Sequence, residues 1–381
     1  MVQLPYISVS PKEMTTSPDM NALTGVWPPE ELEHLGHCPI CSSTNRKLLH
    51  PQLTDRIFYC APGEWSLQSC QSCNAAYLDP RPNIQSIGKA YKNYFTHEKT
   101  DSPKSQSSEG VSYSTTWLAK LRQWGQSGLN GYRNARWNMT LEPTNTWGRW
   151  LVPCIWPLRS LVINHMRHLP RRLPKTGGSL LDVGCGNGDF LRLAQAAGWD
   201  VQGVDFDPLA VEAARKHKLD VRHGGLEQVQ ERKGSYDWIT CSHVIEHVHD
   251  PVQWLSDMHA LLRPGGTLWL QTPNIDSWGH HKFGPNWRDL DPPRHLVLFT
   301  LSGLCKKLND AGFIAPKTRG LPAFIISSVI ATSEALQNGR NATLLFRLAY
   351  LLRPRFLLPA VWQSFSKEHG EFITITVMRS P

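Results

Sequence analysis

Residues 180–191 read LLDVGCGNGDFL, an apolar strand signal that runs into three glycines and then into a helix signal. Glycine at Gly184, Gly186 and Gly188 permits a tight turn and lets a ligand approach the backbone. The helix that follows offers backbone N–H groups that favour negative charge. The spacing differs from the dinucleotide fingerprint, whose third glycine comes one residue later, and from the P-loop, which continues into Lys-Ser or Lys-Thr.

The next strand signal ends at Asp205, inside GVDFDP at 203–208. An acid about 20 residues beyond such a loop accepts hydrogen bonds from ribose hydroxyls. The neighbouring Phe206 is placed to lie against an adenine face. The alternative is that Asp205 caps the strand end and binds no ligand. We favour the first interpretation because the glycine-rich loop lies upstream.

Outward from this stretch, strand signals alternate with amphipathic helix signals. Such alternation predicts a parallel sheet that helices cover on both faces. An apolar stretch at 321–369 interrupts the pattern before the last strand. The expected strands are 179–183, 200–205, 219–222, 236–241, 267–271 and 371–378.

The chain resembles the class I S-adenosylmethionine-dependent methyltransferases in the order and spacing of four features. These are D-x-G-x-G-x-G at 182–188, an acid at the end of strand two, YDWITCSHVIEHV at 236–248 and LLRPGGTLWLQTPN at 261–274. This resemblance covers about residues 179–320, with the last strand at 371–379. It implies a Rossmann-like, doubly wound, mostly parallel seven-stranded α/β sheet with S-adenosylmethionine as cofactor.

The resemblance also implies roles for individual residues. The 182–188 loop would hold the methionine part of the cofactor, Asp205 the ribose, and strand four at 237–242 would line the methyl-transfer pocket. Family members often have an acid near the adenine after strand three, but HGGLEQ stands there, which leaves the backbone and Leu226 for that contact. The expected cofactor-binding residues are Asp182, Gly184, Cys185, Gly186, Gly188, Asp205, Phe206, Leu226 and Ser242.

Two C-x2-C pairs precede this region, Cys38 with Cys41 and Cys70 with Cys73. Four thiolates on two such turns match a tetrahedral structural zinc site. Free dithiols or a redox pair are the alternatives, but redox motifs occur singly on a thioredoxin-type helix. The run that ends in CQSCNAAYLDPRP at 70–82 resembles the zinc-ribbon module that precedes a subset of bacterial methyltransferases. Metal would then supply the folding energy of a module too small for its own core.

The segment after strand four reads His243-Val-Ile-Glu246-His247. H-x-x-E-H is also the inverted zinc-protease signature, but here it follows a strand behind a cofactor loop, which argues against a protease. In related ubiquinone-pathway O-methyltransferases, a similar E-x-x-E-H segment is associated with a divalent metal near the acceptor. Histidine replaces the first glutamate here, so two interpretations stay open: a divalent metal site, or an ordering role in the pocket.

A polar, aromatic segment at 276–300 follows strand five, where substrate loops occur in doubly wound sheets. It contains His295. A hydroxyl acceptor must lose its proton as it attacks the sulfonium methyl, and histidine suits that role near neutral pH. We therefore predict His243 and His295 as candidate catalytic bases; the alternative for His295 is that it only holds its loop in place.

Composition bounds the rest. The chain has 381 residues, nine cysteines and a formal net charge of +8, and its start lacks a secretory signal. These features predict a cytoplasmic protein. The apolar stretch contains Arg347, Arg353 and Arg355, and with the Trp/Arg-rich 147–171 it predicts either a helical cap or peripheral contact with the inner membrane face. The expected organisation is a loose leader at 1–35, a zinc-ribbon-like module at 36–97, a linker and helical segment at 98–176, the core at 177–320, an apolar helical insertion at 321–369 and the last strand at 370–381.

The predicted function is methyl transfer from S-adenosylmethionine to a small-molecule, glycan or lipid-linked acceptor, at oxygen. Nitrogen or carbon methylation is the alternative, and so is a non-catalytic binding module built from the zinc ribbon and the Rossmann-like domain. Nucleic acid is disfavoured as a substrate, because SHVI at 242–245 replaces the Asn/Asp-Pro-Pro-Tyr/Phe signature of base methylation. The oligomeric state stays open.

Overall fold

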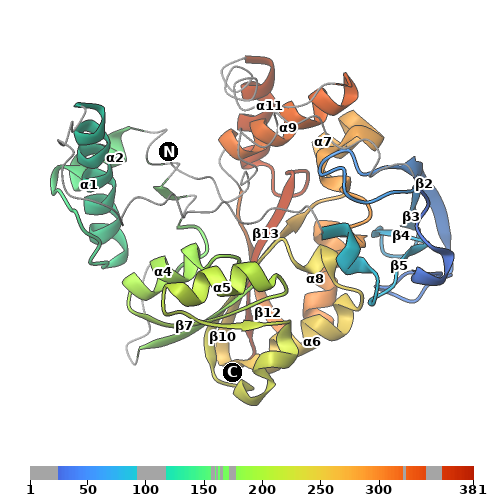
Figure 1. Ribbon diagram of the computed structural model, residues 1–381, viewed down its shortest axis with the longest axis horizontal. Helices are drawn as coiled ribbons and strands as arrows, with labels where there is room; N and C mark the ends of the chain where they lie inside the picture. The colour runs from blue at the N-terminus through green and yellow to red at the C-terminus, as the bar shows by residue number, and fades with distance from the viewer. Residues whose placement is uncertain are drawn as a thin grey trace, which may run out of the picture.

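A computed structural model of the chain describes residues 25–91, 117–155, 159, 162–163, 166–170, 177–320, 323–339 and 354–381. Within them the strands form a seven-stranded sheet, a four-stranded sheet and a two-stranded pair. Figure 1 shows the four-stranded sheet at one side of the molecule and the helices α9 and α11 above the larger sheet. The leader at 1–24 and the predicted linker at 98–116 lie outside the described residues.

The larger sheet has the order β12-β13-β10-β9-β6-β7-β8, with β13 antiparallel to both of its neighbours. The mostly parallel, doubly wound prediction is therefore confirmed. The order reverses between β6 and β9, and ligands bind at the carboxyl ends of the strands beside such a switch point. The strands are β6 (Gly178–Val183), β7 (Trp199–Asp205), β8 (Asp220–His223), β9 (Tyr236–Ser242), β10 (Leu262–Pro273), β12 (Phe313–Thr318) and β13 (Phe372–Arg379).

Strand β12 is the member of this sheet that the sequence pattern missed. It is an edge strand with four consecutive exposed positions and a proline in its sequence, FIAPKT. Proline within a strand is confined to edges and bulges, which fits the edge position of β12. Because four consecutive positions are exposed, the segment also lacks the alternation of apolar and polar residues by which a strand is predicted. Its register with β13 shifts between Ile314 and Lys317.

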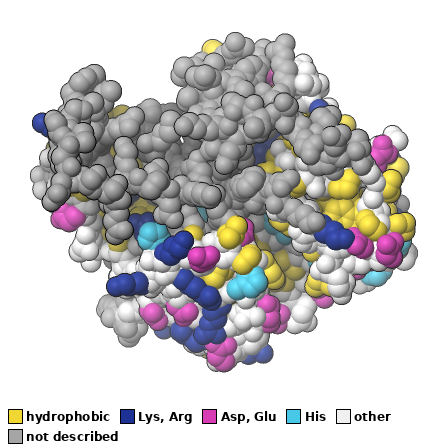
Figure 2. All heavy atoms as spheres, in the orientation of Figure 1, with side chains coloured by type: hydrophobic (Ala, Val, Ile, Leu, Met, Phe, Trp, Pro, Cys, Tyr) yellow, Lys and Arg dark blue, Asp and Glu magenta, His cyan; other side chains and the backbone are white. Residues whose placement is uncertain are grey.

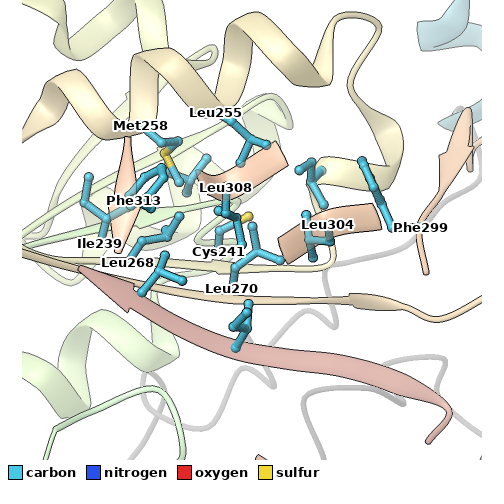
Figure 3. Close-up of a cluster of buried hydrophobic side chains, with 14 of the residues drawn as sticks. Ile239, Cys241, Leu255, Met258, Leu268, Leu270, Phe299, Leu304, Leu308 and Phe313 are labelled. Atoms are coloured by element: carbon cyan, nitrogen blue, oxygen red, sulfur yellow. The ribbon is translucent and has the colours of Figure 1, made fainter. Parts of the chain in front are cut away.

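Helices cover both faces of the sheet. Figure 3 shows one apolar layer, in which Leu268 and Leu270 of β10 meet Leu255 and Met258 of α6. Burying side chains of this size contributes roughly 1.5–3 kcal/mol each, so the layer holds the parallel strands rigidly beneath the site. The helices that flank the sheet are α4 (Asp189–Ala196), α5 (Pro208–Lys216), α6 (Pro251–Leu261) and α8 (Leu301–Asp310).

The four-stranded sheet belongs to the N-terminal module but borrows a strand from the core. Its order is β11-β4-β3-β2, and Val297 of β11 pairs with Tyr77 of β4. The N-terminal module and the core therefore share one sheet. Its strands are β2 (Arg46–Leu53), β3 (Trp65–Cys70), β4 (Ala76–Leu78) and β11 (Val297–Leu298), beside the pair β1 (Leu32–Glu33) and β5 (Arg81–Pro82).

The described part of the predicted leader is not loose. Trp27 is 3% exposed and its ring lies edge-on to Trp65, with ring centroids 5.5 Å apart. Strand β1 follows and pairs with β5. Residues 25–35 therefore pack on the N-terminal module, which the sequence pattern does not predict because a single buried tryptophan within a Ser/Thr/Pro-rich stretch carries no periodic signal.

The predicted helical segments form helices where they are described. These are α1 (Trp117–Trp137), α2 (Trp147–Cys154), α9 (Ala323–Gln337) and α11 (Pro354–Phe365). Arg347 and Arg353 lie outside the described residues, as does the side chain of Arg355. Among the described helices none is both long and apolar enough to cross a bilayer. The shorter elements are α7 (Trp278–Phe283), η3 (Pro29–Glu31), η4 (Ile87–Tyr91), η5 (Leu226–Arg232), η6 (Ile245–His247), η7 (Gly284–Asn286) and η8 (Arg288–Leu290).

Candidate functional site

The glycine-rich loop lies at the carboxyl end of β6, beside the switch point. Gly184, Gly186 and Gly188 all have positive φ values, of 74°, 55° and 80°. A Cβ at Gly184 would lie 2.5 Å from Val244 Cγ2, so this glycine is also required by close packing. A Cβ at Gly186 would meet nothing within 4 Å, which leaves the backbone there open to a ligand. Cys185 between them is buried.

Asp205 at the end of β7 is tied to this loop. Its Oδ2 accepts a hydrogen bond of 2.7 Å from the Gly186 N–H, and its Oδ1 accepts one of 2.9 Å from the Asp207 N–H. The side chain is thereby fixed at the loop, and a carboxylate is a group that can accept hydrogen bonds from ribose hydroxyls. Phe206 follows and is 72% exposed, so its ring is accessible to an adenine face. Leu226 is buried at the start of η5.

Asp182 ends β6 behind the loop and is buried. It accepts a hydrogen bond of 2.6 Å from Thr240 Oγ1. Burial raises the pKa of Asp182 to about 7; the charge of Asp205 also raises it, and the Thr240 hydrogen bond opposes both. A cationic group placed beside this carboxyl would stabilise its charged form, which suits the ammonium of a methionine moiety. Ser242 lies at the carboxyl end of the adjacent β9, partly buried.

His243 follows β9 and has a positive φ of 58°, uncommon for a residue other than glycine. Its Nδ1 lies 3.1 Å from Glu246 Oε1 and its Nε2 3.2 Å from Gln271 Oε1. The same Gln271 oxygen accepts a hydrogen bond of 2.9 Å from Arg167. Both ring nitrogens therefore face oxygens that accept, an environment that an imidazolium satisfies better than a neutral ring.

The electrostatics of this pair oppose one another. Burial lowers the pKa of His243, while the hydrogen bond and charge of Glu246 raise it. Burial disfavours the charged form of Glu246, but the hydrogen bond from His243 brings its pKa down to about 2. We take His243 as neutral at pH 7, because burial is the larger effect on its pKa. An acceptor hydroxyl that reached His243 would have to replace the Gln271 contact, which is the longer of the two.

His295 reaches the same corner from the segment after β10. Glu246, His247 and His295 offer ligand-capable atoms that all lie within 4.8 Å of one another. His247 Nδ1 lies 2.9 Å from the Arg294 carbonyl, and His295 Nδ1 lies 2.7 Å from the Asp289 carbonyl. A carbonyl only accepts, so in its neutral form either ring would carry its proton on Nδ1 and its lone pair on Nε2.

This arrangement can serve two chemistries. Burial lowers the pKa of His295 to about 4, so its Nε2 lone pair is available at neutral pH for a proton or for a metal ion. The group that could hold a metal consists of Glu246, His247 and His295, whereas the sequence suggested His243 with Glu246 and His247. The Nε2 atom of His243 instead faces the side-chain oxygen of Gln271. Sequence spacing could not have brought in His295, which the fold alone places here.

The four cysteines of the N-terminal module come together. Cys38 Sγ lies 3.6 Å from Cys73 Sγ, and Cys41 Sγ lies 3.5 Å from Cys70 Sγ. Tetrahedral zinc with Zn–S bonds of about 2.3 Å needs sulfur atoms roughly 3.8 Å apart, so the cluster fits a zinc ion. The hydrogen bond from Cys73 lowers the pKa of Cys38 to about 5, which favours a thiolate ligand there.

The module and the acceptor side of the core are joined by buried polar contacts. Arg294 is fully buried, with its NH2 2.7 Å from Asp55 Oδ1 and 2.6 Å from Asp291 Oδ1. A second contact joins the module to the core, where the Nε2 atoms of His50 and His280 lie 2.9 Å apart. Arg294 follows Pro292 and Pro293 in the sequence, and the carboxylate of Asp55 that it meets belongs to the module, which no local pattern reveals.

Comparison with known proteins gives the following matches. Residues 159–315 match the family described as "Methyltransferase domain". The ubiquinone biosynthesis O-methyltransferase of Xanthomonas campestris pv. campestris (strain B100) is 36% identical over 125 residues, which are 31% of this chain and 52% of that protein. The chain thus spans about half the length of the curated relatives it matches.

Solved structures were also matched. A SAM dependent methyltransferase from Archaeoglobus fulgidus shares 17% identity with a TM-score of 0.38, over 54% of this chain and 87% of the other. A possible histamine N-methyltransferase from Thermotoga maritima shares 19% identity with a TM-score of 0.38, over 62% of this chain and 96% of the other.

Proposed function

We propose that this chain, which carries a class I S-adenosylmethionine-dependent methyltransferase domain, transfers the methyl group of S-adenosylmethionine to an oxygen of a small-molecule, glycan or lipid-linked acceptor. The observation that carries the proposal is the corner formed by the open Gly186 backbone, the Asp205 carboxylate and the exposed Phe206 ring. Oxygen is preferred over nitrogen or carbon because the curated relatives are O-methyltransferases by name.

The residues of the site divide the work of catalysis. The sulfonium methyl is already activated, so most of the acceleration comes from holding the acceptor oxygen and the methyl in line. A hydroxyl must also lose a proton, and we assign that proton to His243 or His295. His295 has the simpler geometry, since its Nε2 carries the lone pair and its Nδ1 is fixed by the Asp289 carbonyl.

A metal at Glu246, His247 and His295 is the second candidate for this corner, supported by the pre-oriented lone pairs of the two imidazoles. It would occupy the lone pair that base catalysis by His295 needs. Elemental analysis separates the two: a metal beyond the cysteine-bound zinc, lost in His295→Ala but retained in Cys38→Ser, favours the metal.

Cofactor binding provides the direct test. Calorimetry should show S-adenosylhomocysteine binding to the native chain, and Gly186→Arg should abolish it, because the new side chain would occupy the open side of the loop. Asp205→Asn should weaken binding at least about tenfold, a cost of roughly 1.4 kcal/mol for impaired ribose contacts. Leu209→Ala is the matched control: Leu209 is 64% exposed on the adjoining α5, so its loss should leave affinity unchanged.

Two results would decide against the proposal. Binding of NAD in place of S-adenosylhomocysteine would assign the loop to another cofactor. Cofactor binding without any labelled methyl product, across hydroxyl, amine and carbon acceptors screened by thermal shift in the presence of S-adenosylhomocysteine, would support the non-catalytic alternative.

A further inference from the structure

We propose that the chain binds the surface of an anionic lipid bilayer through two exposed apolar surfaces. The first is the tryptophan patch, formed by Leu121 and Trp124 of α1 with Trp150 and Leu151 of α2. The second is the α11 stripe, formed by Leu358, Trp362 and Phe365. The inference does not rest on the methyl-transfer function, because it concerns side chains outside the cofactor corner.

The tryptophan patch is open to solvent and firmly supported. Its side chains Leu121, Trp124, Trp150 and Leu151 are 59%, 55%, 72% and 46% exposed. Trp124 stacks on Trp147 with ring centroids 4.4 Å apart, which joins the two helices. Beneath them the helices approach so closely that a Cβ at Gly148 would lie 1.7 Å from the Gly128 carbonyl oxygen. The patch is therefore a preformed surface and not a frayed end.

Helix α11 is apolar on two faces. Phe356 and Ala360 are buried where α11 packs against α9. Leu358, Trp362 and Phe365 are 68%, 57% and 80% exposed, at a spacing of four and three residues that places them along one side of the helix. A surface helix of a globular protein normally has a polar outer face, so the stripe indicates contact with a second apolar environment.

Charge identifies that environment as an anionic surface. Helices α1, α2 and α11 contain no Asp or Glu, and residues 117–172 hold nine Lys and Arg against one acid, Glu142. Arg149 lies over the Trp150 ring at 5.2 Å, so a cation accompanies the most exposed tryptophan of the patch. Basic residues are attracted to an anionic leaflet, and tryptophan prefers the bilayer–water interface.

The leucines favour a bilayer over a nucleic acid. A nucleic-acid surface uses aromatic rings for base stacking and cations for phosphates, and gains little from exposed leucine side chains. Figure 2 shows charged side chains of both signs mixed over α4 and α5. The lack of acidic side chains is therefore a feature of α1, α2 and α11 and does not extend to α4 and α5.

The two surfaces lie on the side of the molecule that carries the site. Figure 1 shows α1, α2 and α11 on the side of the large sheet away from the C-terminus. Strand β13 runs antiparallel to β10 and ends near the C-terminus, so the opposite side holds the carboxyl ends of the parallel strands. Helices α1, α2 and α11 therefore lie on the side of the sheet where the parallel strands end.

Vesicle co-sedimentation of the full chain tests the proposal. We expect binding to vesicles of equal phosphatidylglycerol and phosphatidylcholine, and at least tenfold weaker partitioning to phosphatidylcholine alone. Trp150→Ser combined with Trp362→Ser should lower partitioning at least tenfold, and Arg149→Glu should lower it only on the anionic vesicles. Ile84→Ser is the matched control, because Ile84 is an exposed apolar side chain of the N-terminal module.

Each outcome decides the matter. The double variant must keep the native circular dichroism spectrum and thermal midpoint, which shows that it is folded; a second double variant, Leu121→Ser with Leu358→Ser, repeats the measurement if it does not. Lack of vesicle binding by the native chain overturns the proposal, as does equal binding by native and variant chains. Binding to single-stranded DNA with no binding to vesicles would also overturn it.

Discussion

Replacing Asp55 with asparagine should destabilise the joint between the N-terminal module and the core by about 2–4 kcal/mol at pH 7. Burial raises the pKa of Asp55, but the hydrogen bonds and charge of Arg294, with backbone N–H groups, outweigh it and bring the pKa from 3.8 down to about 2. At 1.36 kcal/mol per pH unit that lowering is worth roughly 2.4 kcal/mol. The upper end of the range, about 4 kcal/mol, includes the cost of leaving buried Arg294 with only one carboxylate, since breaking a buried ion pair costs about 3–5 kcal/mol.

The pH dependence gives the sign of the effect. A carboxyl whose pKa is lower in the folded state stabilises the protein fully above its unfolded pKa of 3.8. That contribution disappears as the pH falls through the folded pKa of about 2. The native joint should therefore lose stability between about pH 4 and pH 2, and Asp55→Asn should lack this component because asparagine does not titrate.

Native-state hydrogen exchange at β4 and β11 measures the joint directly, because these strands pair across it. Arg294→Met should cost more than Asp55→Asn, since it leaves both Asp55 and Asp291 buried without their cation. Glu212→Gln is the control: its ion pair with Lys216 is exposed on both sides and should change stability by less than about 0.5 kcal/mol. Unchanged exchange protection in Asp55→Asn at pH 7 would refute the reasoning.

Three other outcomes are expected. Elemental analysis should find about one zinc per chain bound by the cysteine cluster, lost in Cys73→Ser; unchanged metal in that variant would place the zinc elsewhere. His280 should stay neutral in the fold, because burial lowers its pKa to about 4, so the unfolded chain takes up the proton first and stability should fall by up to about 3 kcal/mol from pH 6.5 to pH 4. In His280→Asn, thermal midpoints should fall less steeply over this pH range than in the native chain, because His295 and the other buried histidines still contribute; an unaltered slope contradicts the assignment. His243→Ala or His295→Ala should lower turnover at least about tenfold while S-adenosylhomocysteine affinity stays within about threefold, and near-native turnover in both variants and in the double variant would mean that the pocket works by orientation alone.

The parts of this molecule that local sequence determines were predictable. Gly184, Gly186 and Gly188 need positive φ, and that need is visible in the residue type, so loop, strand and helix followed from the sequence in order. The two C-x2-C turns indicated a metal cluster because this residue type and spacing are typical of zinc ligands. Cys38 and Cys73 are far apart in the chain, but four cysteines in two such turns are typical of one zinc site, so their proximity could be predicted.

What could not be predicted depends on contacts between distant segments. From the sequence, Arg294 belongs to the segment that follows strand five, and only the fold shows that it pairs with Asp55. His295 lies close to Glu246 only in the folded chain, where the segment after β10 returns to the end of β9. Strand β11 has two residues, too short for any periodic signal. These positions follow from the three-dimensional fold, which residue spacing encodes only indirectly.

Strand β11 also affects how the chain can be made. Strand β4 leaves the ribosome long before Val297 and Leu298 exist, and at about 5–20 residues per second the delay is roughly 10–40 s. During that interval the nascent β4 edge has an unpaired row of backbone donors and acceptors, the kind of edge that recruits foreign strands. A gene fragment that encodes only the N-terminal module would make this temporary state permanent, and its product should aggregate unless a substitute strand is supplied.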